Sequence, residues 1–526
     1  MLYPHFSLDQ LVPLFPALAL LLAAVCWFEF TPRKKTAIVL LILGSIALNL
    51  FVALLDPFLN PWDELYHALV AKNLTQNPLY PALFAEPLLP YDFKNWTDNH
   101  IWVHKQPLFL WQLASSIALF GANELAVRLP SILMKALVAF FIYRIGKKTL
   151  DGTTGFYAAL LFATAYYPLE VMVGKLPTDH NDIAFLFYVT ASMWAWIEHA
   201  YQPNKKWIIA IGLFAGAAVL VKWLLGLLVF PIWGLTILLD PEKRTDLKSY
   251  KQIAFSGGIA AVCFLPWQFY IRWRFPAESG FEMDYNSRHL FEVIEGHGGT
   301  NRFHWDGLEA IYGHGDVVPF VILVALALLW WTVKRSDTRI MLVGSVLFIY
   351  SLFTIAATKM VGYCLVVSPI IFLALANLFK QGFDWLMEKI PNNLSWAHRL
   401  LLPTVFLVLS FHLLSLERLE SKHTLAKPWS NENRAEIMER YSHMPAIKAS
   451  LDGGNYVLLN TGKHYNIAFM FYYDITAYRH LPALSEINTL LESGHQVAIF
   501  ESPDIPEFWK EDARIKWLKW PEKKEK

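Results

Sequence analysis

The chain has 526 residues, of which 55% are hydrophobic and 17% are charged, with a net charge of +1 and a mean hydropathy of +0.34. Nucleic-acid-binding proteins carry an excess of basic charge, so this balance argues against a nucleic acid as partner. The three cysteines, Cys26, Cys263 and Cys364, lie inside apolar runs, which argues against a disulfide framework or a cysteine metal site. The composition is typical of a polytopic membrane protein.

Apolar runs long enough to cross a bilayer as helices recur from the N-terminus to about residue 416. The fold class predicted is therefore a polytopic α-helical membrane protein with about twelve transmembrane helices. The expected spans are 8–30, 36–55, 126–144, 153–170, 183–200, 207–221, 224–239, 251–271, 316–333, 338–356, 361–379 and 399–416.

Charge predicts the orientation of these spans. The connections at 33–35, 144–148, 205–206 and 243–251 are short and rich in Lys and Arg, so by the positive-inside rule they face the cytoplasm. The opposite, outer side then carries the long connections and the end of the chain, which are 56–125, 171–182, 272–315 and 417–526. We expect the chemistry on that outer side, which in a bacterial inner membrane would be the periplasmic face.

The outer segments contain structure of their own. Within the first loop, 65–76 and 107–120 are each predicted to be a helix lying in the membrane interface. The chain divides into a membrane domain, 1–416, and a small periplasmic α/β domain, 417–526. In that tail we expect strands at 455–460, 467–478 and 496–500, and a helix at 485–493.

Two adjacent acids, Asp63 and Glu64, follow Pro61 where the second span ends. The structural interpretation is a helix cap, since acids and proline suit a first helical turn. The functional interpretation is a general base held at the membrane surface. Both interpretations are compatible, because a helix start fixes the position of a carboxylate.

Further polar residues lie at the outer ends of apolar runs, among them His104, Lys105, Asp179, Asp182 and Lys222. Each isolated cation could be an interfacial anchor. Together, acids that can take a proton from a hydroxyl and cations that can neutralise a phosphate predict a lipid-phosphate sugar donor. The lipid tail would then lie among the spans and the sugar in the outer cavity.

The order of several motifs resembles the GT-C glycosyltransferases of the protein O-mannosyltransferase type, and especially their bacterial branch that includes the lipid A aminoarabinose transferase. The similarity covers about 50 to 380, and the matching motifs are Asp63-Glu64, His104 to Leu108, Glu124 to Pro130, Val221-Lys222, Leu265-Pro266-Trp267 and Lys359 to Tyr363. Three positions depart from the family pattern: Gln106 replaces a proline, Trp223 a glycine, and Lys175 an arginine.

The resemblance implies roles for individual residues. Asp63 would be the catalytic base, supported by Glu64. The donor phosphate would be held by Lys105, with Arg288, Lys359, Tyr363 and Lys222. The sugar or acceptor would be positioned by Asp179, Asp182, Lys175 and His104. The resemblance implies no essential cofactor, and His104, His289 and His297 leave a metal site as an alternative.

The resulting hypothesis is an inverting glycosyltransferase that moves a sugar from a polyprenyl phosphate, in bacteria undecaprenyl phosphate, to a hydroxyl or phosphate acceptor. Its expected partners are membrane lipids, the lipid-linked sugar and the acceptor. That acceptor could be lipid A, a surface glycan, or a Ser or Thr of a protein. An oligosaccharyltransferase-like enzyme and a lipid flippase or transporter are the alternative functions.

Overall fold

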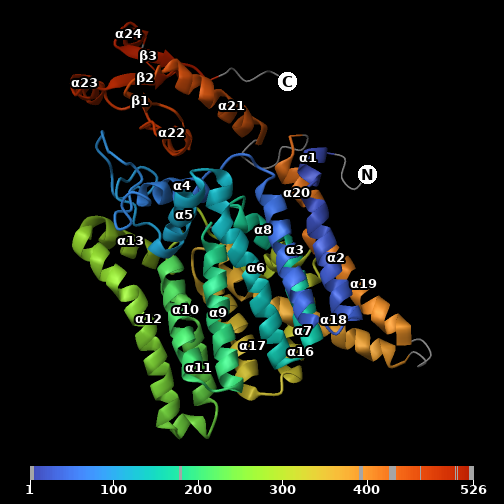
Figure 1. Ribbon diagram of the computed structural model, residues 1–526. Coiled ribbons are helices and arrows are strands. Elements are labelled where there is room, and N and C mark those ends of the chain that lie inside the picture. The colour runs from blue at the N-terminus through green and yellow to red at the C-terminus, as the bar shows by residue number, and fades with distance from the viewer. Residues whose placement is uncertain are drawn as a thin grey trace.

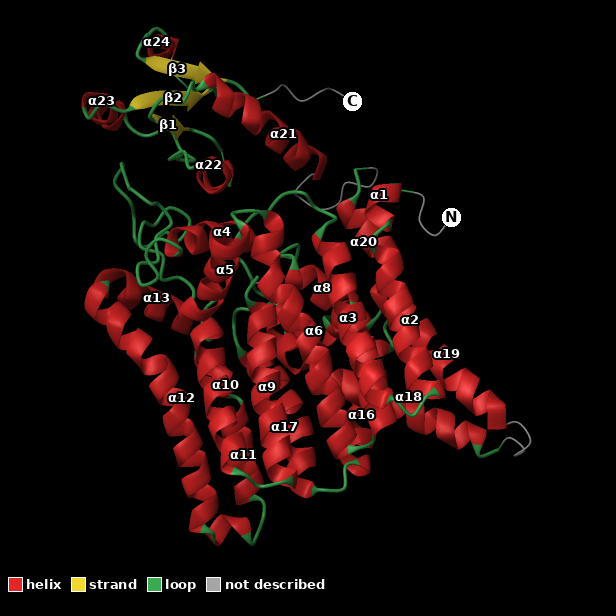
Figure 2. Cartoon of the chain, viewed as in Figure 1, coloured by secondary structure: helices red, strands yellow, loops and turns green. Residues whose placement is uncertain are grey.

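The computed structural model describes residues 5–176, 180–389, 395–425, 434–462, 464–503, 505 and 507–520. Long helices run side by side through most of the molecule, and a small domain at the C-terminal end covers one end of this bundle (Figure 1). The long connections and helices α4, α5 and α13 lie at that same end, whereas the opposite end carries short connections. Strands occur in the C-terminal part, as Figure 2 shows.

The helices of the membrane part follow the apolar runs of the sequence. In chain order they are α1 (Leu8–Leu11), α2 (Leu14–Phe30), α3 (Lys34–Ala53), α4 (Asp63–Leu74), α5 (Pro107–Phe120), α6 (Glu124–Thr149), α7 (Gly152–Thr164), α8 (Tyr166–Met172), α9 (Asp182–Tyr201), α10 (Lys205–Lys222), η1 (Leu224–Leu227), α11 (Val229–Leu238), η2 (Lys243–Thr245), α12 (Leu247–Arg274), α13 (Pro276–Arg288), α14 (Phe303–Asp306), α15 (Leu308–Tyr312), α16 (Val318–Thr332), α17 (Ser336–Ile355), η3 (Val361–Val367), α18 (Ser368–Met387), α19 (Ser395–Leu414) and α20 (Leu416–His423).

A helix overlaps every predicted span, and the helices predicted at 65–76 and 107–120 are present as α4 and α5. Their position in the membrane interface stays a prediction. The polytopic α-helical fold class is thereby confirmed. Within the described residues, seven helical segments are long and apolar enough to cross a membrane. Others, such as α7 with 13 residues, are shorter than the roughly 20 residues that a straight crossing requires. The number of twelve crossings therefore stays a prediction.

Polar residues at the ends of the runs start the helices. Asn123 accepts a hydrogen bond from the backbone N–H of Ala126 at the start of α6, and Asp151 accepts two from Thr153 and Thr154 at the start of α7. These side chains satisfy donors that the first helical turn leaves without a partner. The short connection between α6 and α7 then allows the two helices to pack as neighbours.

The C-terminal part is an α/β unit. A three-stranded parallel sheet in the order β1 (Tyr456–Leu459), β2 (Gln496–Phe500), β3 (Ile515–Leu518) has Leu458 opposite Ala498 and Ala498 opposite Lys516. The accompanying helices are α21 (Arg434–Ser450), α22 (Tyr465–Tyr473), α23 (Leu484–Glu492) and α24 (Glu507–Lys510).

The predicted strand at 467–478 is wrong, because this segment contains most of α22. All residues from Asn466 to Phe471 are buried, so the segment has no exposed face and its apolar run fits a buried helix as well as a strand. Strand β3 was not predicted, since its four residues include Lys516 and give too short a pattern. The other two strands and the helix at 485–493 are confirmed.

Helix α22 packs against α4 and fixes the small domain above the first loop. The Lys72 ammonium lies 2.7 Å from the Asp474 carboxylate, and the Tyr472 hydroxyl donates a hydrogen bond of 2.6 Å to Glu124. The tail is therefore attached to the end of the bundle at which the predicted site lies.

Candidate functional site

The two adjacent acids begin helix α4 and have different surroundings. Asp63 is half-buried, whereas Glu64 is completely buried. The preceding residue, Trp62, has φ 70 and ψ −131, a backbone conformation that bulky residues rarely adopt. The chain therefore turns sharply just before Asp63 and sets the carboxylate at the start of the helix.

Glu64 forms a buried ion pair with Arg128 of α6. The Nε of Arg128 lies 2.7 Å from Oε1 of Glu64, and the second Glu64 oxygen accepts a 2.6 Å hydrogen bond from the backbone N–H of Asn60. The same guanidinium donates to the carbonyl oxygens of Ala53, Asp56 and Phe58. Glu64 thus holds the turn that carries Asp63, which agrees with a supporting role rather than direct chemistry.

The second outer loop packs directly on Glu64. Gly174 has φ +64, and a Cβ at this position would lie 2.7 Å from the Cβ of Glu64, so a side chain there would collide with the acid. The Asn60 side chain also donates to the carbonyl oxygen of Val173. Loops one and two therefore meet at the start of α4.

Two histidines, His67 of α4 and His180 just before α9, form a further contact between these loops. His67 lies four residues after Asp63, on the same face of α4, and its ring stacks on that of His180 with centroids 5.6 Å apart. Burial, together with the charge of Arg128, lowers the pKa of His180 to about 3, so its imidazole is neutral at physiological pH. Two residues further on, Asp182 begins α9.

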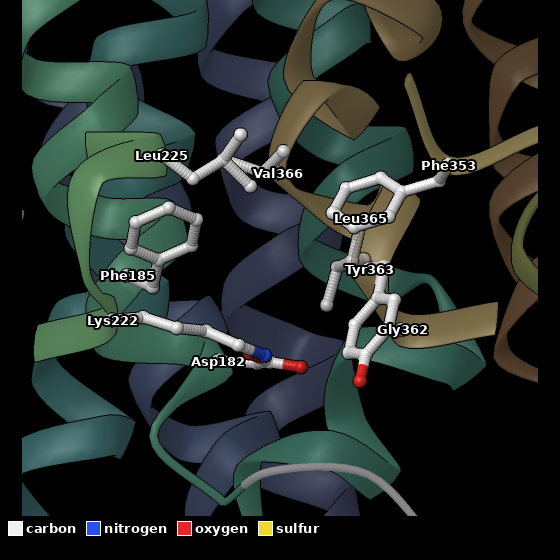
Figure 3. Close-up of a pocket in the computed structure, with 9 residues that line it drawn as sticks. All are labelled: Asp182, Phe185, Lys222, Leu225, Phe353, Gly362, Tyr363, Leu365 and Val366. Carbon is white, nitrogen blue, oxygen red and sulfur yellow. The ribbon is translucent and has the colours of Figure 1, made fainter. Parts of the chain in front are cut away.

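Asp182 leads into a pocket lined by residues of α9, α10, η1, α17 and η3. Lys222 forms an ion pair with Asp182, and its ammonium lies 5.0 Å from the ring centre of Tyr363. Figure 3 shows these three polar ends together, with Phe185, Leu225, Phe353, Leu365 and Val366 also lining the pocket. The pocket is open to solvent on one side, and its roughly 240 Å³ of empty space includes that solvent. A cation beneath apolar walls can hold an anionic head group whose tail is apolar.

Trp223, which follows Lys222, has φ 60 and ψ −167. This region of backbone space is almost exclusive to glycine. The chain therefore makes a glycine-like turn after α10 despite the bulky side chain, at the position where the sequence resemblance expects a glycine.

His104 and Lys105 belong to a second polar group, between the first and third outer loops. Nδ1 of His104 lies 3.0 Å from Oε2 of Glu282, and its ring stacks on Trp96 at 4.9 Å. Burial would raise the pKa of Glu295, but hydrogen bonds from Trp96 and Tyr285 and the charges of His104 and Lys105 lower it. Lys105 therefore lies where these two loops meet.

Several predicted site residues lie apart from the pocket. The Lys359 ammonium donates to the carbonyl oxygens of Phe353, Thr354 and Ala356 at the end of α17, which uses its three hydrogens. The Arg288 guanidinium lies 3.3 Å from the Asp284 carboxylate and 3.6 Å from the Glu292 carboxylate. In this arrangement neither cation is directed to the pocket, so we leave both out of the proposed donor site.

Lys175 points to Asp56, with Nζ 3.3 Å from Oδ2, and not to Asp182. Asp179 lies outside the described residues. Nδ1 of His289 lies 3.0 Å from the carbonyl oxygen of Tyr285, and the carbonyl oxygen of His297 accepts from the backbone N–H of Lys359. In the described part of the chain, no three His, Cys, Asp or Glu side chains converge as metal ligands.

The most important residue missed by sequence reasoning is Arg128. It stands within the motif Glu124 to Pro130, which carried part of the family resemblance. A single arginine inside an apolar span is a signal in its own right, because a buried charge needs a partner. The partner, Glu64, could not be named without the fold.

The helices and the small C-terminal sheet define a polytopic α-helical membrane protein. A family model described as dolichyl-phosphate-mannose-protein mannosyltransferase matches residues 104–270. The structure of ArnT from Cupriavidus metallidurans in the apo state is similar with a TM-score of 0.62, at 15% identity, over 90% of this chain and 94% of that one. The structure of the same protein bound to undecaprenyl phosphate is similar with a TM-score of 0.59, at 14% identity, over 86% of this chain and 88% of that one.

Sequence relatives point in the same direction. An undecaprenyl phosphate-alpha-4-amino-4-deoxy-L-arabinose arabinosyl transferase of Pseudomonas savastanoi is 25% identical over 48% of this chain and 48% of its own length. An uncharacterized protein of Aquifex aeolicus is 21% identical over 63% of this chain and 61% of its own length. The chain thus matches less than two thirds of the length of these relatives. The predicted resemblance to GT-C glycosyltransferases of the protein O-mannosyltransferase and aminoarabinose transferase type is confirmed.

An oligosaccharyltransferase has a related architecture. AglB from Archaeoglobus fulgidus, solved with an inhibitory peptide and a dolichol-phosphate, gives a TM-score of 0.52 at 12% identity, over 87% of this chain and 65% of that one. This likeness concerns the fold.

Proposed function

We propose that this protein is an inverting glycosyltransferase that uses a sugar linked to undecaprenyl phosphate, on the periplasmic face of a bacterial inner membrane. The observation that carries the proposal is the pocket in which Lys222, Asp182 and Tyr363 meet under apolar walls. The His67 and His180 rings connect this pocket to the helix that begins at Asp63. The similarity to an arabinosyl transferase that uses undecaprenyl phosphate supports the choice of donor.

Each residue has a defined part in the proposed reaction. The Asp63 carboxylate accepts the proton of the acceptor hydroxyl, whose oxygen forms a bond to the anomeric carbon from the face opposite the phosphate. The bond between the anomeric carbon and the phosphate oxygen breaks, and undecaprenyl phosphate leaves with the electron pair. Lys222 stabilises the negative charge on the departing phosphate from the pocket, and Lys105, to which the family resemblance gives the same part, would do so from the second polar group. Glu64 and Asp182 hold Asp63 and Lys222 in place.

The test is Asp63→Asn in purified protein reconstituted into lipid nanodiscs. Donors are undecaprenyl phosphate carrying 4-amino-4-deoxy-L-arabinose and undecaprenyl phosphate carrying mannose, with lipid A and a Ser/Thr peptide as acceptors. Since a general base contributes about 10²–10⁴-fold, turnover should fall by a factor in this range. Release of undecaprenyl phosphate and the mass of the acceptor are the measurements.

Asp284→Asn is the matched control, because the Asp284 side chain is 69% exposed and pairs weakly with Arg288. It should keep normal turnover. Normal turnover of a correctly folded Asp63→Asn variant would contradict the role given to Asp63.

An oligosaccharyltransferase-like enzyme stays the second candidate, because AglB shares this fold. Such an enzyme would transfer a lipid-linked oligosaccharide to an asparagine side chain of a peptide. Transfer to an Asn-containing peptide, dependent on an added divalent cation, would select this function over transfer of one sugar to a hydroxyl or phosphate.

A further inference from the structure

The indole of Trp62 stands beside the proposed base and is partly open to solvent. Trp62 is 37% exposed, although tryptophan is usually well buried. Its backbone has φ 70, so a glycine would suit the turn better than this large residue. Backbone conformations of this kind persist mainly at functional sites. The side chain itself therefore needs an explanation.

An aromatic wall formed by Trp62, Trp96 and His104 extends from Trp62 towards Lys105. The Trp62 and Trp96 rings have centroids 6.2 Å apart, and Trp96 stacks on His104 at 4.9 Å with an interplanar angle of 7°. The Trp96 indole N–H also donates to Glu295. This wall joins the position of the base to the loop that carries Lys105.

The C-terminal unit supplies the opposite side of Trp62. The His464 ring, at the start of α22, meets the Trp62 ring with centroids 4.3 Å apart and an interplanar angle of 68°. His464 also has a positive φ, of 69. Two aromatic residues that are about 400 positions apart in the sequence, both in backbone conformations unusual for their type, thus meet next to Asp63.

We propose that Trp62 and His464 together form the acceptor subsite of Asp63, that the tail is needed to complete it, and that the group it accepts is a saccharide ring. This inference rests on the proposed glycosyltransferase function. The apolar C–H face of a sugar ring packs on a flat indole such as that of Trp62, which is 37% exposed. His464 is buried with both ring nitrogens enclosed, so its part is to hold the indole in position from the other side. A flat aromatic surface thus favours a glycan or the sugar part of a glycolipid over a peptide.

The test uses Trp62→Ala, Trp62→Phe and His464→Ala in nanodiscs with lipid A as the acceptor probe and the Ser/Thr peptide in parallel. For the two alanine variants we expect KM for lipid A to rise about tenfold or more, which corresponds to one lost contact of moderate strength. Their kcat should change by no more than about threefold, since Asp63 is intact. Trp62→Phe keeps an aromatic face and should recover most of the affinity.

A second readout separates acceptor binding from a general loss of structure. The share of cleaved donor that goes to water instead of lipid A should rise in the alanine variants. Trp273→Ala is the matched control, because Trp273 is 79% exposed at the end of α12 and is not part of the wall. The Trp273→Ala variant should leave KM, kcat and the share of donor lost to water unchanged.

The outcomes of the proposed function and of this inference can be distinguished. An unchanged KM for lipid A in both alanine variants, while Asp63→Asn is inactive, would overturn the inference alone. Transfer of the sugar to the peptide and not to lipid A would also overturn the inference without affecting the proposed function. Loss of kcat in parallel with loss of thermal stability would assign Trp62 a structural role. Turnover by Asp63→Asn, or absence of transfer to either acceptor by the wild type, would count against the proposed function itself.

Discussion

At the scale of single residues, the position of Asp63 depends on a buried pair that does not itself react. Glu64 and Arg128 are both fully buried and bind each other through two contacts, of 2.7 and 3.1 Å. Arg128 also donates to the backbone of the turn before Asp63. Removing both charges from water costs free energy, which offsets much of the attraction between them. The pair therefore acts mainly by fixing the turn before Asp63. Loss of either residue would leave the other as an unpaired buried charge.

Glu64→Gln should therefore destabilise the protein by about 3–5 kcal/mol, since the variant leaves the Arg128 charge buried and unneutralised. Thermal or denaturant unfolding of the purified protein measures this loss. Glu292→Gln serves as the control, because Glu292 is 55% exposed and lies 3.6 Å from Arg288, a type of pair worth roughly 0–1 kcal/mol. Equal stability of the two variants would contradict the structural role of Glu64.

At the scale of helices, close packing between α6 and α7 depends on two small residues. A Cβ on Gly146 would lie 2.5 Å from the Cα of Gly155 and 2.8 Å from a methyl carbon of Leu373. The two backbones therefore approach at a distance that only glycine permits, as is common where membrane helices cross. This crossing keeps α6, which carries Arg128, in register with the rest of the bundle.

Gly146→Ala should cost about 1–3 kcal/mol in stability through overpacking. Gly257→Ala on α12 is the matched control, because a Cβ there meets no atom within 4 Å. Alanine is the better helix former by roughly 0.5–1 kcal/mol, so this control should be neutral or slightly more stable. Thermal unfolding in detergent compares the two. A Gly146→Ala variant as stable as the control would mean that α6 and α7 separate without cost.

For the whole molecule, a buried ionic junction ties the tail to the membrane part. The two ring nitrogens of His423 each lie 2.8 Å from a carboxylate oxygen, one of Asp56 and the other of Glu170. Arg434, the first residue of α21, binds the second Asp56 oxygen at 2.7 Å, and Lys175 approaches at 3.3 Å. Residues from the first and second outer loops and from the start of the tail thus share one network.

This junction predicts acid sensitivity. Burial alone would raise the pKa of Asp56, but His423, Lys175 and Arg434 hold it well below its usual value. A lowered pKa contributes stability above the unfolded pKa, about 4, which is lost as the pH falls further towards the folded pKa. The stability difference between wild type and Asp56→Asn should therefore be largest near pH 6–7 and shrink below about pH 4.

Thermal unfolding at a series of pH values measures this difference. The exposed Asp284→Asn variant should follow the wild type across the whole range. A difference between wild type and Asp56→Asn that stays constant down to pH 3 would show that Asp56 carries no stabilising charge.

The sequence by itself determined the helices, their approximate bounds, the α/β style of the tail and the family resemblance. These depend on local patterns, because apolar runs and end-of-helix residues act within a few turns of chain. Lys222 and Asp182 were identified as site candidates for the same reason, since each stands at an end of an apolar run, whereas Tyr363 was named through the family resemblance.

Only the tertiary structure decided which of those residues meet. It joined Lys222 to Asp182, 40 residues away, and turned Lys359 back to the end of the preceding helix, α17. It also showed that Glu64 is paired with Arg128 and that His464 of the tail lies on Trp62 beside Asp63. The physical reason is that a charge or ring in a buried site is satisfied by whichever group the packing of distant segments brings to it, and local sequence patterns do not encode that choice.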